Sequence, residues 1–280
     1  MTYASAIARR ISTIVLSAAL VMISGCASFQ TPVENKLAAP VGKIDVTSLT
    51  SAMAERDRSL ESLQTSAVME FTSGADHVKA REDIIVRRPG SLRVEAMSPF
   101  GVALIVAAQD SRLQIFEPSK NTLMRGTADA ATLARFARIP MAPRDAVGLL
   151  MGIVPEAQTT SPPQSVGTEG SMTILTYAEA GGVRRELGFQ DGQLAMVRKR
   201  TPDGAVNFEI RYADYRDIGG VMFAYKVKAD FPVAATRVSF LYKRPIVNGK
   251  IADSMFTLTP NGAKLVDIGM ASDARDRRDG

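Results

Sequence analysis

The chain has 280 residues, 46% of them hydrophobic and 22% charged, and its formal net charge is +5. The length and hydrophobic content fit one domain of up to ~250 residues. The small net charge gives no indication of nucleic-acid binding. Its single cysteine and single histidine exclude an intrachain disulfide and a zinc site with several Cys or His ligands. A catalytic triad would have to use His77, which lies in a polar run expected to form an exposed turn, so neither an enzyme nor a metal or other cofactor is expected.

The start of the chain has the pattern of a lipoprotein leader. Residues 1–10 are basic without acids, and the apolar run Ile11 to Ile23 is shorter than the ~20 residues of a spanning helix. The next residues, Ile23-Ser24-Gly25-Cys26, resemble the bacterial lipobox, with isoleucine where leucine is common. The resemblance implies that residues 1–25 are a signal peptide and that acylated Cys26 attaches the protein to a lipid membrane. An ordinary secretory leader or short anchor with an incidental cysteine is the alternative.

Residues 26–44, with two prolines and a glycine, predict a flexible tether between Cys26 and the folded domain. Within the lipobox resemblance, Ala27 stands where an aspartate often retains proteins in the inner membrane. This implies an outer-membrane location, with the domain facing the periplasm. Apolar residues at roughly helical spacing then predict a helix over residues 47–62.

Alternating apolar and polar side chains next predict five short strands separated by turn residues. Their apolar positions fall within residues 67–71, 84–86, 92–97, 102–108 and 113–115. Two helices follow in the prediction. The first runs from Thr127 to Arg138 and is stopped by Pro140, and the second runs from Pro143 to Met151 and ends at Gly152.

Residues 155–170, rich in Pro, Ser, Thr and Gly, predict a flexible loop. The strand pattern then returns, with apolar positions within residues 172–174, 183–189, 194–196, 206–212, 223–227 and 236–242. The last ordered segment is expected over residues 255–268. The charged residues 271–280 predict a disordered tail.

The expected fold of residues 45–270 is mainly β (α+β), an antiparallel sheet of about ten or eleven strands. Each strand is apolar on one face, which the sheet must cover. A strongly curved half-barrel with a helical lid would cover it and leave an apolar cavity, whereas a fully packed core is the alternative. A one-residue slip would reverse the choice of face. The candidate cavity-lining residues are Met69, Phe71, Ile84, Val94, Ile115, Phe136 and Leu149.

Three stretches resemble the LolA/LolB family of periplasmic lipoprotein-trafficking proteins, whose fold is a half-closed barrel with a helical lid. Val86 to Gly101 is similar to the family's basic-proline turn, Leu-Arg strand and proline-hydrophobic-glycine loop. Ile139 to Pro155 is similar to its proline-bracketed lid helices, and Asn248 to Gly262 to its closing strand region. Together they span about residues 45–268. The chain departs from the family in having no tryptophan and in its greater length.

The resemblance implies an outer-membrane lipoprotein that binds acyl chains of lipoproteins or lipids in a hydrophobic cavity and acts in lipoprotein localisation and insertion. It makes a periplasmic carrier a candidate partner. In the family's outer-membrane receptor, the hydrophobic residue of the proline-hydrophobic-glycine loop projects and helps insert lipoproteins into the membrane. Pro99, Phe100 and Gly101 match that loop. The alternative is that Phe100 folds back as a core plug.

Two other functions stay open on the sequence. One is a structural or sensor lipoprotein of the same fold, which would act through protein–protein contacts and carry no lipid. The other is an enzyme such as a hydrolase, for which the adjacent acids Glu82 and Asp83 are candidates. A charged strand edge is the commoner meaning of such a pair, so a non-enzymatic binding protein is the leading hypothesis.

Overall fold

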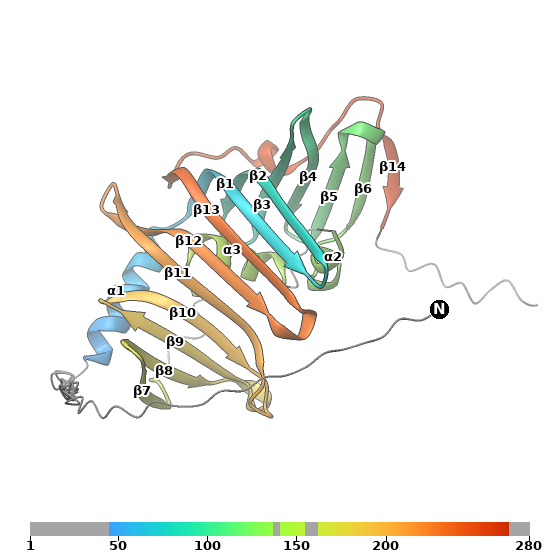
Figure 1. Cartoon of the computed structure of the whole chain (residues 1–280). Helices are drawn as coiled ribbons and strands as arrows, with labels where there is room; N and C mark the ends of the chain where they lie inside the picture. The colour runs from blue at the N-terminus through green and yellow to red at the C-terminus, as the bar shows by residue number, and fades with distance from the viewer. Residues whose placement is uncertain (1–44, 137–140, 155–161, 269–280) are drawn as a thin grey trace, which may run out of the picture. The chain divides into compact units, whose positions relative to one another are not determined.

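A fourteen-stranded sheet with three α-helices makes up the part of the chain that the computed structural model describes, residues 45–136, 141–154 and 162–268. The sheet is open and curved (Figure 1). These residues belong to a compact unit, residues 44–280, distinct from residues 1–43. All buried apolar clusters of the described chain lie inside this unit. It therefore has a hydrophobic core of its own, formed by both meanders and all three helices, as an independently folding domain requires.

The sheet consists of two consecutive meanders. The first contains β1 (Ser62–Ser73), β2 (Asp76–Arg87), β3 (Ser91–Ser98), β4 (Gly101–Gln109), β5 (Arg112–Glu117) and β6 (Thr122–Thr127). The second contains β7 (Ser165–Glu169), β8 (Met172–Ala178), β9 (Arg184–Gln190), β10 (Gln193–Arg200), β11 (Val206–Ile218), β12 (Val221–Phe231) and β13 (Thr236–Val247). A short last strand, β14 (Lys264–Asp267), runs parallel to β6 at one edge.

The two meanders join through β1 and β13, which pair in antiparallel register from Leu63 opposite Val247 to Ser73 opposite Thr236. The strand order is therefore β14-β6-β5-β4-β3-β2-β1-β13-β12-β11-β10-β9-β8-β7. Every other neighbouring pair of strands is also antiparallel, except β14 with β6. The mainly β, antiparallel prediction is confirmed.

The helices begin and end where their sequences dictate. α1 (Val46–Ser59) starts after Asp45, whose side chain accepts a hydrogen bond from the Ser48 amide at 3.1 Å. α2 (Ala130–Phe136) and α3 (Pro143–Met151) connect the two meanders. α3 has its proline in the first turn and ends at Gly152, whose φ of 67° is left-handed. The predicted Pro143–Met151 helix is confirmed.

Other predicted boundaries are wrong. The helix expected over residues 47–62 ends at Ser59, and β1 begins at Ser62. The helix expected from Thr127 starts only at Ala130, because Thr127 still belongs to β6. The count of ten or eleven strands misses β6 and β7, which are short and lack clean alternation. All five side chains of β7 are exposed, so no apolar face marks this edge strand within the expected loop 155–170.

The C-terminal segment covers part of the outer face of the first meander. Phe256 and Leu258 are 2% and 5% exposed, and Leu258 packs with Ala107 of β4 and Leu123 of β6 in a separate apolar cluster. Gln114 of β5 fixes this segment because its amide donates to the Leu258 carbonyl at 3.1 Å and accepts from the Leu258 amide at 2.9 Å. β4 is apolar on both faces because both faces are covered.

A buried charge cluster occupies the outer face of the second meander. Arg198 of β10 is 6% exposed and lies opposite Glu186 of β9 and Glu209 of β11 in the register. Its guanidinium donates to Glu209 at 2.6 Å, to Glu186 at 2.8 Å and to Glu169 at 2.9 Å. One buried cation thus bridges carboxylates from three strands, and Arg200 and Arg211 add a second partner to Glu186 and Glu209.

Candidate functional site

A cavity of about 170 Å³ lies between the inner face of the sheet and the helices α2 and α3. Every residue that lines it is apolar except Glu82. The walls come from both meanders, because β1 to β4 and β13 all contribute. Its lining residues are Met69, Phe71, Val78, Glu82, Leu92, Val94, Ala96, Leu104, Val106, Leu133, Ala146, Leu150, Val238 and Phe240.

Strand alternation places these side chains on one face. In β3 the residues Leu92, Val94 and Ala96 face the cavity, and the register sets Val94 opposite Val106 of β4 and Ala96 opposite Leu104. The same alternation in β2 brings Val78 and Glu82 to this face. Val78 is 39% exposed, so the cavity reaches solvent near the start of β2.

Glu82 is the unusual member of this lining. Glu82 is 7% exposed, and its cross-strand neighbours are Ala67 on β1 and Ala96 on β3. Among the described residues none gives it a hydrogen bond or an ion pair. Burial raises the pKa of the Glu82 carboxyl to about 7. An acid that is half-protonated near neutral pH therefore lies in an otherwise apolar cavity.

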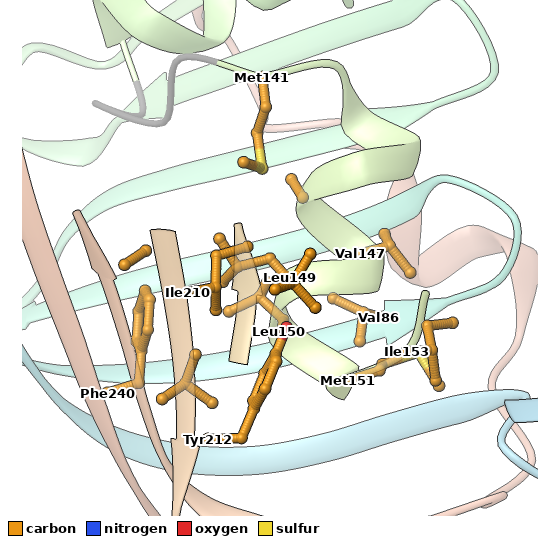
Figure 2. Close-up of a cluster of buried hydrophobic side chains, with 14 of the residues drawn as sticks. Val86, Met141, Val147, Leu149, Leu150, Met151, Ile153, Ile210, Tyr212 and Phe240 are labelled. Carbon is orange, nitrogen blue, oxygen red and sulfur yellow. The ribbon is translucent and has the colours of Figure 1, made fainter. Parts of the chain in front are cut away.

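The helix α3 contributes Ala146 and Leu150 to the lining of this cavity. Figure 2 shows Leu149 and Leu150 directed toward Ile210 and Phe240, and all four belong to the main buried cluster. The backbone carbonyl of Leu150 accepts a hydrogen bond from the Tyr242 hydroxyl at 2.8 Å. This bond ties the helix to β13, where the two meanders meet.

A second set of contacts holds the end of α3. Arg56 of α1 donates to the Gly152 carbonyl at 2.7 Å, and the Asp57 carboxylate accepts from the Val154 amide at 2.9 Å. Burial outweighs these favourable contacts and raises the pKa of Asp57 to about 6. Arg56 and Asp57 also pair with each other at 3.0 Å. The chain after α3 is thus anchored to α1 by polar contacts that sequence reasoning missed.

A second pocket of about 290 Å³ lies against α3 over the second meander and is more polar than the first. Leu149 lines this pocket, together with Asp145, Arg185 and Lys199. Arg185 is 6% exposed and pairs with Glu179 at 2.6 Å. The structure therefore places two neighbouring leucines of α3 at different pockets, Leu150 at the first and Leu149 at the second.

The predicted cavity residues are only partly brought together. Met69, Phe71 and Val94 lie on the wall of the first cavity. Ile84 and Ile115 are buried, at 0% and 1% exposure, but are not among its lining residues. Leu149 lies at the second pocket, as described above. Phe136 ends α2, and its side chain lies outside the described residues, as does Cys26.

The predicted loop lies at the β3–β4 hairpin. Phe100 is 100% exposed, so its ring does not fold back into the core. Its backbone amide donates to the Ser98 hydroxyl at 3.2 Å, and Gly101 has a φ of 115° that L side chains rarely adopt. The Pro99-Phe100-Gly101 turn therefore presents an aromatic ring at a strand tip.

Glu82 is a cavity residue that was not predicted, although the sequence contains a signal for it. Glu82 has the same parity in β2 as Ile84 and Val86, which were expected to share one face. The Glu82–Asp83 pair is therefore not a charged strand edge, because its two side chains lie on opposite faces of β2. In the described ranges there is neither a cluster of residues suited to a metal ion nor a helix long and apolar enough to span a membrane.

No protein-family model matches this chain, and no curated protein does. Solved structures match it. A LolA superfamily protein from Nitrosomonas europaea has a TM-score of 0.52 at 12% identity, covering 77% of this chain and 98% of its own. A DUF1329 family protein from Desulfovibrio piger has 0.51 at 13%, covering 75% and 94%. A putative outer membrane lipoprotein-sorting protein domain from Vibrio parahaemolyticus has 0.51 at 8%, covering 75% and 94%. The chain has a LolA-like fold.

Proposed function

We propose that this protein is an outer-membrane lipoprotein that binds acyl chains of lipoproteins or other lipids in the cavity beneath α2 and α3, without making or breaking bonds. The apolar lining of this cavity is the observation that carries the proposal. A volume of about 170 Å³ bounded by aliphatic and aromatic side chains favours hydrocarbon over water. The fold supports it, because the similar solved structures include a LolA superfamily protein and a lipoprotein-sorting domain.

The proposal includes the membrane attachment inferred from the sequence. Residues 1–25 are the signal peptide, acylated Cys26 is the anchor, and residues 26–44 are the tether that lets the domain stand off the membrane. The tail predicted over residues 271–280 lies outside the described residues. The domain faces the periplasm, where a soluble carrier is the candidate donor of cargo.

The exposed tip of the β3–β4 hairpin is proposed to act in the transfer of the lipid from the cavity to the membrane. Phe100 is fully exposed, and an aromatic ring at a strand tip is favoured at the interface of a bilayer. During this proposed transfer Phe100 contacts the acceptor membrane, and α2 and α3 act as the lid of the cavity. Transfer is then driven by the difference in affinity between cavity and membrane, so the cavity holds its cargo with moderate affinity.

Native mass spectrometry of residues 44–280, combined with lipid extraction, tests the binding function. We expect an acylated ligand at one-to-one stoichiometry, either co-purified or added as a synthetic lipopeptide. Ala96→Phe should abolish the complex, because its phenyl ring would occupy the cavity. A cavity of about 150 Å³ binds one benzene molecule, so a cavity of similar volume has no room for both the ring and a ligand. Ala75→Phe adds the same ring to the exposed β1–β2 turn and is the matched control.

A wild-type domain that purifies without ligand and does not bind added lipopeptide would contradict lipid binding. That result would favour the structural or sensor lipoprotein, which acts through protein–protein contacts. Binding that survives Ala96→Phe would place the lipid elsewhere on the domain.

A further inference from the structure

The carboxyl group of Glu82 is a polar group built into an apolar cavity. The residue is 7% exposed and lines the cavity. Its cross-strand neighbours Ala67 and Ala96 carry only methyl groups on this face. Small neighbours leave space around the carboxyl group, so a ligand can approach its oxygen atoms.

The elements packed around Glu82 bring no charge of opposite sign to it. Alternation turns Arg81 and Asp83 of β2 to the other face of the sheet. The cavity residues of α2, α3, β4 and the near part of β13 are apolar, namely Leu133, Ala146, Leu150, Leu104, Val106, Val238 and Phe240. On the helices, Arg135 and Arg144 are exposed, and Asp145 lines the second pocket.

One titratable group does face this region. Tyr242 of β13 is 1% exposed, and burial, then Tyr212 and then Glu82 raise the pKa of its phenol. The Tyr242 hydroxyl already donates to the Leu150 carbonyl at 2.8 Å. Its single proton is therefore not available to Glu82.

The protonated carboxyl is the form that this environment favours. Burial raises the pKa of Glu82 to about 7, and a protonated carboxyl has one O–H to donate. A pure hydrocarbon would leave that donor unsatisfied, at a cost, whereas a ligand oxygen would accept it. A cationic ligand would need the ionised carboxylate, which burial disfavours.

We propose that the cavity selects an acyl ester or amide, with the ligand's carbonyl oxygen accepting a hydrogen bond from the carboxyl group of Glu82. This rests on the proposed lipid-binding function and names the ligand class of the same cavity. The acyl chain lies against the aliphatic walls, and Glu82 fixes the end that carries the carbonyl. The carbonyl group, and not the chain alone, then determines which amphiphiles are retained.

The volume of the cavity determines the chain length of suitable probe molecules. Since about 150 Å³ accommodates benzene, about 170 Å³ accommodates one chain segment of roughly six to eight carbon atoms. Methyl octanoate, octane and octylamine share this chain length and differ in the polar group. We would titrate residues 44–280 with each probe at pH 6 and pH 8 and follow binding by calorimetry and by amide NMR shifts.

We expect methyl octanoate to bind about three- to tenfold more tightly than octane at pH 6, the range that one net hydrogen bond gives. Its affinity should fall by up to about tenfold between pH 6 and pH 8, as the free carboxyl ionises. Glu82→Gln keeps an N–H donor, so the ester preference should remain and the pH dependence should disappear. Glu82→Leu should abolish the ester preference while octane still binds.

Asp83→Asn is the matched control. Asp83 is the adjacent acid, on the other face of β2, where it accepts from the Ser66 hydroxyl at 2.7 Å, so this variant should bind all three probes as the wild type does. Equal binding of ester and octane in the wild type, or tightest binding of octylamine with affinity rising with pH, would overturn the ester and amide assignment and leave lipid binding standing. Failure of all three probes to bind would overturn both proposals.

Discussion

Replacing Glu82 by glutamine should change the pH dependence of stability. The pKa of Glu82 is about 7 in the folded chain against a reference value of 4.5. Between pH 4.5 and pH 7 the native state therefore holds more protons than the unfolded state, and the free energy of unfolding falls as pH rises through this window. A difference of about 2.5 units corresponds to about 3 kcal/mol. This destabilisation is absent below the window and complete above it.

Urea unfolding of residues 44–280 at pH 4, 6 and 8 measures this effect. The stability of Glu82→Gln relative to the wild type should rise by about 3 kcal/mol from pH 4 to pH 8, because glutamine does not ionise. Other titrating groups contribute to both proteins and cancel in the difference. Asp83→Asn should show no comparable trend. A relative stability of Glu82→Gln that stays constant over this pH range would refute the assignment of Glu82 as a buried, proton-retaining carboxyl.

Three further substitutions test other features. Phe100→Glu should leave the unfolding midpoint unchanged, because the ring is fully exposed, yet abolish delivery of lipoproteins to acceptor vesicles; unchanged delivery would contradict the membrane role, and Phe100→Leu should retain it. Arg198→Met should cost about 3 kcal/mol, since it removes the buried cation that three carboxylates share and leaves them only Arg200 and Arg211 as partners. The exposed pair of Arg237 with Asp230 offers Arg237→Met as a near-neutral control, and an equal loss in both variants would argue against the buried cluster. Tyr242→Phe should cost about 1 kcal/mol by removing the bond to Leu150 and should speed amide exchange in α3, an effect that hydrogen-exchange mass spectrometry would detect or exclude.

The elements that sequence predicted well have strong local signals. α3 has a proline that fits its first turn and a glycine that fits the left-handed residue after it, so both ends are set by chain chemistry alone. Strands with one buried face, such as β11 and β13, alternate visibly. For these elements local and tertiary preferences agree.

The features that were missed depend on contacts distant in sequence. β7 is a strand because β8 lies beside it, and its fully exposed side chains carry no periodic signal. The position of Leu149 at the second pocket depends on how α3 is rotated over the sheet, which the apolar face of a helix defines only within one residue. Glu82 was visible in the alternation of β2, but a charged residue was not expected to face inward.

The pairing of β1 with β13 has a consequence for how the domain folds. β1 acquires its second neighbour only when β13, the last strand of the second meander, is present. The long chain segment between these two strands must therefore close into a loop at this step. Such non-local pairing slows folding. During synthesis, β1 to β6 can form a meander while the edge of β1 stays unpaired, which exposes a template for aggregation. The cavity is incomplete in this interval, because Val238 and Phe240 of β13 form part of its wall. Under the proposed lipid-binding function, a ligand present during folding therefore stabilises the step at which the two meanders join.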